Sequence, residues 1–331
     1  MNRIATIDIG TNTTLLLVAE ASGETISVLE NRAEITRLGR GIGLTWEPSK
    51  GSHPLPRRYA ADEAGGLPTR VGLGQEGIDR TLAALSGYAV LARVHEAPIF
   101  AIGTEALRRA PNAADFLCRA AALLDTPVEV IDGEREAALT FLAARHSFPE
   151  AAAQTMIVVD IGGGSTELVV ARRGAVDLCR SLPLGSVRLT ERHIHHDPAL
   201  DHEVETVRAE IESQLAQTPF PCEADRPCLV GVAGTATTLA AMAQSLRSYD
   251  PALVHGYRLT LPALEEQVDR LRPSTQRERE AMDGLDPRRA DVIFCGALIL
   301  SEVVRRVGAT EVLVSDRGIR WGLLYEKLGS T

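Results

Sequence analysis

A glycine-rich pattern near the N-terminus of this chain recurs near its middle. The first copy, DIGTNTTLLLVA, starts at Asp8 and the second, DIGGGSTELVVA, at Asp160, so the two align without a gap 152 residues apart. They share Asp, Ile, Gly, Thr, Leu, Val and Ala. So long a period is typical of a duplicated domain rather than a solenoid. The alternative is a chance similarity between two strand–turn–strand units.

Each copy of the pattern opens a predicted β-meander. Alternating helical and strand periodicities follow each meander, which predicts α/β layering with mixed sheets. Thr104 and Asn112 are expected to cap the helices that follow them. Strands are predicted over 4–9, 14–20, 25–30, 97–102, 127–131, 228–234 and 311–315, and helices over 76–94, 115–124, 133–146, 202–217, 237–246, 286–307 and 319–328.

Duplication and length predict two domains that face each other across a cleft. We expect an N-terminal domain over residues 1–146 and a C-terminal domain over 147–317, with a last helix at about 318–331 able to pack back on the first. Residues 46–74 are rich in Pro, Gly and charge and lack periodicity. They predict a mobile surface loop.

Composition excludes some partners. A net charge of −9 argues against nucleic acid or an anionic membrane held by a broad basic surface. The longest apolar run near the N-terminus, LLLVA, is too short for a signal peptide or a membrane span. The five cysteines form no C-x-x-C pair, which indicates a reduced, cytoplasmic protein. They are Cys118, Cys179, Cys222, Cys228 and Cys295.

Three glycine-hydroxyl segments are candidate phosphate cradles: 10–14, 162–166 and 234–238. Successive backbone N–H groups in a glycine turn bind anions, and a hydroxyl adds a donor of little bulk. A single segment of this kind is often an ordinary turn, but three favour a ligand with several phosphates. The candidate phosphate-binding residues are Gly10, Thr11, Asn12, Thr13, Gly162, Gly163, Gly164, Ser165, Thr166, Gly234 and Thr235.

Carboxylates stand beside these segments at Asp8, Asp160 and Glu167. Next to phosphate they repel it unless a cation intervenes, and Mg²⁺ commonly combines one or two carboxylates with waters and phosphate oxygens. The three acids are therefore candidate metal ligands. The alternative for Glu167, which we favour less, is a solvent-facing residue on the next strand. Glu136 lies at a helix start, where the helix dipole favours acids, but a hydrolase also needs a carboxylate that activates water. Arg108 fits either a phosphate contact or a surface salt bridge.

The other candidate reactive residues give weaker evidence of a site. We interpret His193, His195, His196 and Asp197 as a solvated turn, because no cysteine accompanies them. The sequence contains no G-x-S-x-G, Walker A or H-E-x-x-H motif. Serine-triad, P-loop and zincin chemistry are therefore not supported.

Taken together, the motifs resemble the exopolyphosphatase and guanosine pentaphosphate phosphatase family. The resemblance rests on DIGTNTTLLLV, GTEALRRAPNAADFL, VEVIDGEREAALTF, VVDIGGGSTELVV, SLPLGSVRLTE, GVAGTATTLAAM, DPRRADVIFCGALIL and SDRGIRWGLLYE. It implies the short form of the family, with two actin-like (ribonuclease H-like) domains. It also implies exopolyphosphatase activity, in which Mg²⁺ or Mn²⁺ assists release of the terminal phosphate of inorganic polyphosphate. A homodimer is suggested too.

Residue by residue, the resemblance assigns catalysis to Glu136, metal binding to Asp160 and Glu167, and phosphate binding to Arg108. Arg135 departs from the pattern, since the family has a glutamate there, so local charge and substrate preference can differ. Three alternatives stay open. One is a guanosine pentaphosphate 5′-phosphohydrolase of the stringent response, another is a sugar kinase or actin-like ATPase, and the third is a non-catalytic phosphate or nucleotide sensor.

Overall fold

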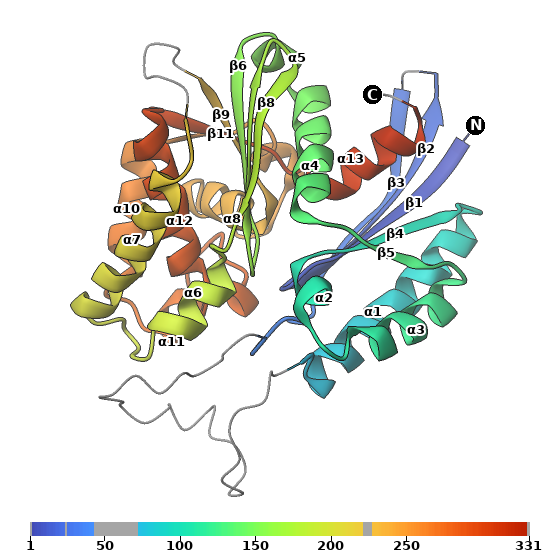
Figure 1. The fold of residues 1–331 in the computed structure, drawn as a ribbon, viewed down its shortest axis with the longest axis horizontal. Coiled ribbons are helices and arrows are strands. Elements are labelled where there is room, and N and C mark those ends of the chain that lie inside the picture. The colour runs from blue at the N-terminus through green and yellow to red at the C-terminus, as the bar shows by residue number, and fades with distance from the viewer. Residues whose placement is uncertain (1, 24, 43–71, 221–226, 330–331) are drawn as a thin grey trace, which may run out of the picture.

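Two β-sheets, each covered by helices, organise the protein (Figure 1). The structure is a computed structural model, and it describes residues 2–23, 25–42, 72–220 and 227–329. Residues 46–71 of the predicted loop, and Cys222, lie outside the described residues. Among the described residues, no helix is long and apolar enough to cross a membrane.

The first sheet has the strand order β3-β2-β1-β4-β5, and the second has the order β10-β11-β9-β6-β7-β8. In both, an antiparallel meander continues into parallel strands on one side. The strands are β1 Asn2–Ile9, β2 Thr13–Ser22, β3 Thr25–Ile35, β4 Ile99–Gly103, β5 Val128–Val130, β6 Thr155–Ile161, β7 Thr166–Arg172, β8 Ala175–Leu182, β9 Cys228–Val232, β10 Arg258–Thr260 and β11 Glu311–Val314.

The two sheets repeat one another in detail, apart from the extra edge strand β10. Strands β1, β2, β3 and β4 of the first correspond in order and direction to β6, β7, β8 and β9 of the second. The bulge between Val18 and Ala19 recurs between Val170 and Ala171, at the same separation as the sequence repeat. Because chance similarity would not reproduce a bulge, the structure confirms the predicted duplication and the two-part α/β fold.

Helices cover the sheets and build separate cores. The core of the first half joins the first sheet to α1 and α3, and that of the second half joins the second sheet to α6, α7, α8, α10 and α12. The helices are α1 Gln75–Val94, α2 Glu105–Arg109, α3 Ala113–Leu124, α4 Gly133–Ser147, α5 Pro149–Ala152, α6 Ser186–His193, α7 Asp201–Ala216, α8 Ala233–Ala243, α9 Pro251–Val254, α10 Leu261–Leu271, α11 Gln276–Glu280, α12 Ile293–Val307 and α13 Ile319–Lys327, with a 3₁₀ turn, η3, at Pro287–Arg289.

Helices α4 and α13 lie between the two sheets and are exchanged between them (Figure 1). Phe141 of α4, a first-half helix by sequence, packs with the core of the second sheet, beside Val158. Trp321 of α13, at the C-terminal end, packs with Leu17 of the first sheet. The helices therefore link the two halves, and the proposed boundaries near 146 and 317 stay a prediction.

Some local expectations were wrong. The helix predicted from 286 begins only at Ile293, because Asp286 instead accepts a hydrogen bond from the Arg288 N–H and starts η3. Asn112 does not cap α3, since its amide makes two hydrogen bonds to the Leu73 backbone, at 2.7 and 3.0 Å. Thr104 makes no side-chain cap bond. Helix α8 starts at Ala233, not at 237.

Candidate active site

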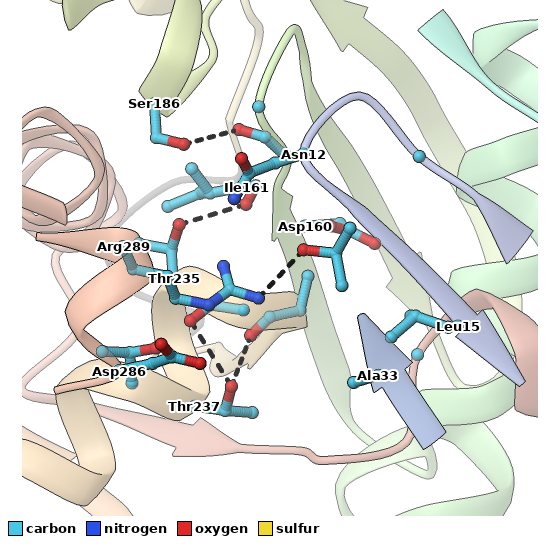
Figure 2. A pocket seen from close by; sticks show the side chains of 18 of the residues that line it. Asn12, Leu15, Ala33, Asp160, Ile161, Ser186, Thr235, Thr237, Asp286 and Arg289 are labelled. Carbon is cyan, nitrogen blue, oxygen red and sulfur yellow. Dashed lines mark hydrogen bonds between the residues drawn. The ribbon is translucent and has the colours of Figure 1, made fainter. Parts of the chain in front are cut away.

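A cavity of about 690 Å³ lies between the two halves, where β1, β6 and β9 end. The turns that follow β1 and β6, the start of α8 and the first turn of α4 all contribute to its wall. Figure 2 shows side chains from both halves around it, including Asn12, Asp160 and Thr235. The predicted site residues that line the cavity are Asp8, Gly10, Thr11, Asn12, Thr13, Glu136, Asp160, Gly162, Gly163, Gly164, Ser165, Gly234 and Thr235.

The turns 10–13 and 162–165 have the same geometry. Gly10 donates its N–H to the Thr13 carbonyl at 3.0 Å, and Gly162 donates to the Ser165 carbonyl at 2.9 Å. The tips touch: a Cβ at Gly163 would lie 3.2 Å from Cγ2 of Thr11. A side chain at this position would therefore crowd the turn of the other half, and residues of both turns line the cavity.

The third predicted cradle is the junction of β9 and α8. Ala233 takes a left-handed φ of 63°, which turns the chain directly from strand into helix. The Thr235 hydroxyl donates to the Ile161 carbonyl at 3.2 Å and ties the junction to the second turn (Figure 2). An eleven-residue helix thus presents its N-terminus to the cavity, where its dipole favours an anion.

Three acids are buried at or beside this cavity. Asp8 and Asp160 are 8% exposed and Glu167 is 2% exposed. Thr140 donates to Asp160 Oδ2 at 3.2 Å and Ser181 donates to Glu167 Oε1 at 2.7 Å, but Asp8 Oδ1 has no hydrogen-bond partner. Burial raises the pKa of Asp8 and of Glu167 well above the usual range, and that of Asp160 to about 6. Repulsion among the carboxylates adds to the pKa rise of Asp8 and Glu167.

This arrangement calls for positive charge. A buried carboxylate with an unpaired oxygen is costly unless a cation meets it. Within the described ranges, no group of three or more His, Cys, Asp or Glu side chains is placed to hold a metal ion. A divalent ion here would therefore need water or phosphate oxygens besides the carboxylates, which suits the coordination that Mg²⁺ prefers.

Glu136 sits in the first turn of α4, where Asp132 caps the helix by accepting the Arg135 N–H at 2.7 Å. Arg108 donates to Glu136 Oε2 at 2.9 Å and to the Ile131 carbonyl at 2.6 Å. Burial still raises the pKa of Glu136 to about 7, although the adjacent Arg108 guanidinium lowers it. Glu136 is thus a base near neutrality that lines the cavity.

Three predicted residues are placed differently from the rest. Arg108, Thr166 and Glu167 are not part of the cavity wall. Arg108 instead pairs with Glu136, and the buried Thr166 hydroxyl donates to the Leu184 carbonyl at 2.7 Å. Position does not support a phosphate contact by the Thr166 side chain. Glu167 lies directly across the β6–β7 ladder from Asp160.

Arg289 was missed by the sequence analysis. Its guanidinium donates to the Thr13 hydroxyl at 3.1 Å and lies over Gly234, where a Cβ would come within 2.2 Å of Nη1 (Figure 2). It therefore joins a cradle from each half inside the cavity. The DPRRAD segment contained the signal, but spacing alone does not distinguish Arg289 from Arg288, which pairs with Asp286 and Glu34.

Glu105 was missed as well. It lines the cavity and accepts from Arg188 of α6, and it pairs with Arg108 at 3.4 Å and with Arg109 at 3.3 Å. Arg188 also donates to the Gly164 carbonyl at 2.6 Å. Glu105 thus connects the arginine beside Glu136 to the second glycine turn.

Two further sequence features take structural roles. Arg135, at the position where the resemblance implies a glutamate, forms an ion pair with Glu326 of α13. In the histidine cluster, His193 lies 2.6 Å from Glu210, and His196 lies 2.9 Å from Glu203. These contacts hold the segment after α6 against α7.

Comparisons with known proteins agree with the geometry. The model of the Ppx/GppA phosphatase family matches residues 63–331. Exopolyphosphatase 2 of Mycobacterium tuberculosis is 36% identical over an alignment of 346 positions, which covers 99% of each chain. The chain belongs to the Ppx/GppA phosphatase family.

Solved structures of the Ppx/GppA family show the same fold. The PPX-GPPA enzyme of Aquifex aeolicus superposes with a TM-score of 0.77 at 31% identity, covering 98% of this chain and 99% of that one. An exopolyphosphatase from Cytophaga hutchinsonii gives a TM-score of 0.83 at 28% identity, covering 100% and 99%. The actin-like two-domain fold and the family resemblance are confirmed. As a family member the chain is a phosphatase, which disfavours a non-catalytic sensor.

Proposed function

We propose that this chain is an exopolyphosphatase, which hydrolyses the terminal phosphate of inorganic polyphosphate with the help of a divalent metal ion. One observation carries the proposal: Glu136, a buried base, faces a cavity walled by glycine cradles from both halves. A chain of phosphates needs several such cradles, whereas a single phosphate needs one. The names of the relatives point in the same direction.

Backbone N–H groups of the turns 10–13 and 162–165 and of the α8 N-terminus bind the phosphates in this proposal. Arg289 adds a charged donor between Thr13 and Gly234. Glu136 orients a water molecule and takes its proton, while the water oxygen bonds to the terminal phosphorus. The bridging P–O bond then breaks, giving orthophosphate and a chain one unit shorter.

Arg108 has two roles in this proposal. In the structure it pairs with Glu136, which holds the carboxylate in place but also occupies it. We propose that the terminal phosphate draws the guanidinium away from Glu136, since phosphate is a strong bidentate partner of arginine. Binding of the substrate would then release the base at the moment it is needed.

Asp8, Asp160 and Glu167 are the carboxylates that would face the metal ion, Mg²⁺ or Mn²⁺. Water and phosphate oxygens would complete its coordination, because the described carboxylates alone are not placed to hold it. The unpaired Asp8 Oδ1 and the raised pKa values of all three acids support a cation here. The ion would offset the charge of the phosphates. Asp8 and Asp160 occupy equivalent positions in the two repeats, but Leu15 stands where the second repeat has Glu167. The second repeat therefore supplies more of the ligands.

The test is phosphate release from short polyphosphate, long polyphosphate, guanosine pentaphosphate and ATP, each with Mg²⁺, with Mn²⁺ or with a chelator. We expect metal-dependent release from polyphosphate and a fall of at least about 10²-fold in Glu136→Gln, the usual scale for loss of a general base. An unaffected mutant would remove Glu136 from this role. Failure of every substrate would refute the proposed activity.

A guanosine pentaphosphate phosphatase is the second candidate, and the uneven lining of the cavity favours it. Apolar side chains, including Leu15, Ala33 and Leu285, share the wall with the phosphate cradles. In Figure 2, Leu15 and Ala33 lie on one side, and Thr237 and Asp286 on the other. An apolar wall suits a nucleobase better than phosphate. Faster release from guanosine pentaphosphate than from polyphosphate would establish this candidate.

The proposal also includes a cellular compartment and an oligomeric state. The described cysteines are free thiols, which supports a reducing, cytoplasmic compartment. They are Cys118, Cys179, Cys228 and Cys295. The homodimer stays a prediction.

A further inference from the structure

A second, smaller cavity lies next to the turn that follows β1. Its volume is about 130 Å³, and it shares Thr11 and Asn12 with the wall of the large cavity. Arg37 and Arg40 come from the segment after β3, whereas Arg279 comes from α11. The small cavity therefore also lies between the two halves, separated from the proposed active site by one turn.

Two buried hydrogen-bond donors without acceptors line this small cavity. Arg279 is 6% exposed, and its Nε has no partner, although Nη2 donates to Asp197 Oδ1 at 3.1 Å. Asn12 is 7% exposed, and its Nδ2 has no partner either. Among the described residues that line the cavity, no other buried side-chain polar atom lacks a partner. An unpaired buried donor costs stability, so this site calls for an acceptor.

The acids of the small cavity already have donors. Arg37 donates to Asp291 Oδ1 at 3.0 Å. The Gly41 N–H donates to both oxygens of Glu191 at 3.1 Å. The Gln276 N–H donates to Asp197 at 2.8 Å. One positive charge of the small cavity is not paired with an acid: Arg40 has no ion pair within the part of the chain that the structure describes.

We propose that the small cavity binds one tetrahedral oxyanion of the phosphate class. Such an ion would accept from Arg279 Nε, from Asn12 Nδ2 and from the Arg40 guanidinium, and planar guanidinium groups match its geometry. The volume is about a fifth of that of the large cavity, and it leaves room for one phosphate.

Occupancy of this site has a consequence for the molecule. Arg40 and Arg279 belong to different halves, so an anion between them would stabilise the contact between the two halves. Asn12 belongs to both cavities, which couples the small site to the first glycine cradle. The site is separate from the proposed active site, and it stands whether or not polyphosphate is the substrate.

Equilibrium dialysis of radiolabelled orthophosphate against the full-length protein, in chelating buffer that prevents turnover, tests the site. We expect the wild type to bind two phosphates per chain, and Arg279→Gln to bind one. Arg40→Gln should weaken the second site about tenfold or more, the scale of a charge-assisted hydrogen bond. Arg277→Gln, an exposed arginine of the same helix that lines neither cavity, should keep both sites.

Several outcomes overturn the inference. One is a wild type with a single phosphate site that Arg279→Gln leaves in place, which would mean that water alone fills the small cavity. Another is an Arg279→Gln protein that melts like the wild type and keeps both sites. If Arg279→Gln fails to fold, an unchanged second site in Arg40→Gln overturns it equally. Excess tripolyphosphate identifies the source: a site that stays filled takes free orthophosphate, and a site that empties takes the end of a chain.

Discussion

At the scale of single residues, burial of Glu136 gives the protein a base that titrates near neutrality. Its pKa is raised to about 7, and only the ionised carboxylate accepts a proton from water. With the metal saturating, kcat/KM on polyphosphate should therefore fall about tenfold from pH 8 to pH 6. Initial rates across this range measure it. A flat profile below pH 7 would contradict the role of Glu136.

The same burial makes the charge of Glu136 destabilising. Its folded-state pKa of about 7 exceeds the ordinary 4.5, so the folded state binds the proton more tightly. The free energy of unfolding therefore falls as pH rises from about 4.5 to about 7 and then stays low. Glu136→Gln removes this penalty and keeps an acceptor for Arg108.

Without metal at pH 8, we expect Glu136→Gln to be more stable than the wild type, by up to about 3 kcal/mol. Thermal melting measures the difference, and the same comparison at pH 5 is the control, where the gain should shrink. A mutant less stable than the wild type at pH 8 would show that the Arg108 ion pair outweighs desolvation. In that case the ionised Glu136 would not lower the stability of the protein.

At the scale of elements, the crossing of α4 and α13 depends on Gly322. A Cβ at this position would lie 1.8 Å from the Leu139 carbonyl oxygen, which is backbone and cannot rotate away. We expect Gly322→Ala to lower the free energy of unfolding by about 3 kcal/mol, at the upper end of ordinary overpacking. Gly318→Ala is the matched control, since nothing lies within 4 Å of its Cβ. Equal denaturation midpoints for the two variants would contradict close packing here.

The repeat made the meanders, the glycine turns and the fold class predictable, because strand period and turn chemistry are local. Long-range contacts were not predictable in this way. Asn112 reads as a helix cap, yet it binds the backbone of Leu73, far away in sequence. We expected the last helix to pack back on the first domain, but the packing of α4 against the second sheet leaves no local signal. Asp286 shows a limit at short range too. An aspartate can begin either a long helix or a short 3₁₀ turn, and here it begins the turn η3.

The same limit applies to the candidate site. The glycine cradles, and Asp8, Asp160 and Glu167, were found because they lie in or next to strands in a recognisable motif. Arg289 and Glu105 were missed because arginines and glutamates on helices are usually solvated. Only the packing of the two halves brings Arg289 to Thr13 and Glu105 to Arg188.

At the scale of the whole molecule, side chains of one half complete the binding surface of the other. Arg289 is the clearest case, since it reaches from the second half to the Thr13 hydroxyl beside the Gly234 cradle. Arg289→Gln should raise KM for polyphosphate about tenfold or more while kcat changes less, because it removes a binding charge and not the base. Steady-state kinetics measure this. Arg288→Gln is the control, as Arg288 pairs with Asp286 and Glu34. An unchanged KM in Arg289→Gln would place the phosphates elsewhere.

The central claim is that Glu136 activates water for attack on the terminal phosphorus of a chain bound between the two halves. Hydrolysis of polyphosphate in ¹⁸O-labelled water, with mass analysis of the products for wild type and Glu136→Gln, tests it most directly. We predict one ¹⁸O in each orthophosphate that the wild type releases. The variant should release phosphate at least about 10²-fold more slowly while still binding polyphosphate. Label in the shortened chain instead of the orthophosphate, or release by Glu136→Gln at the wild-type rate, would contradict the claim.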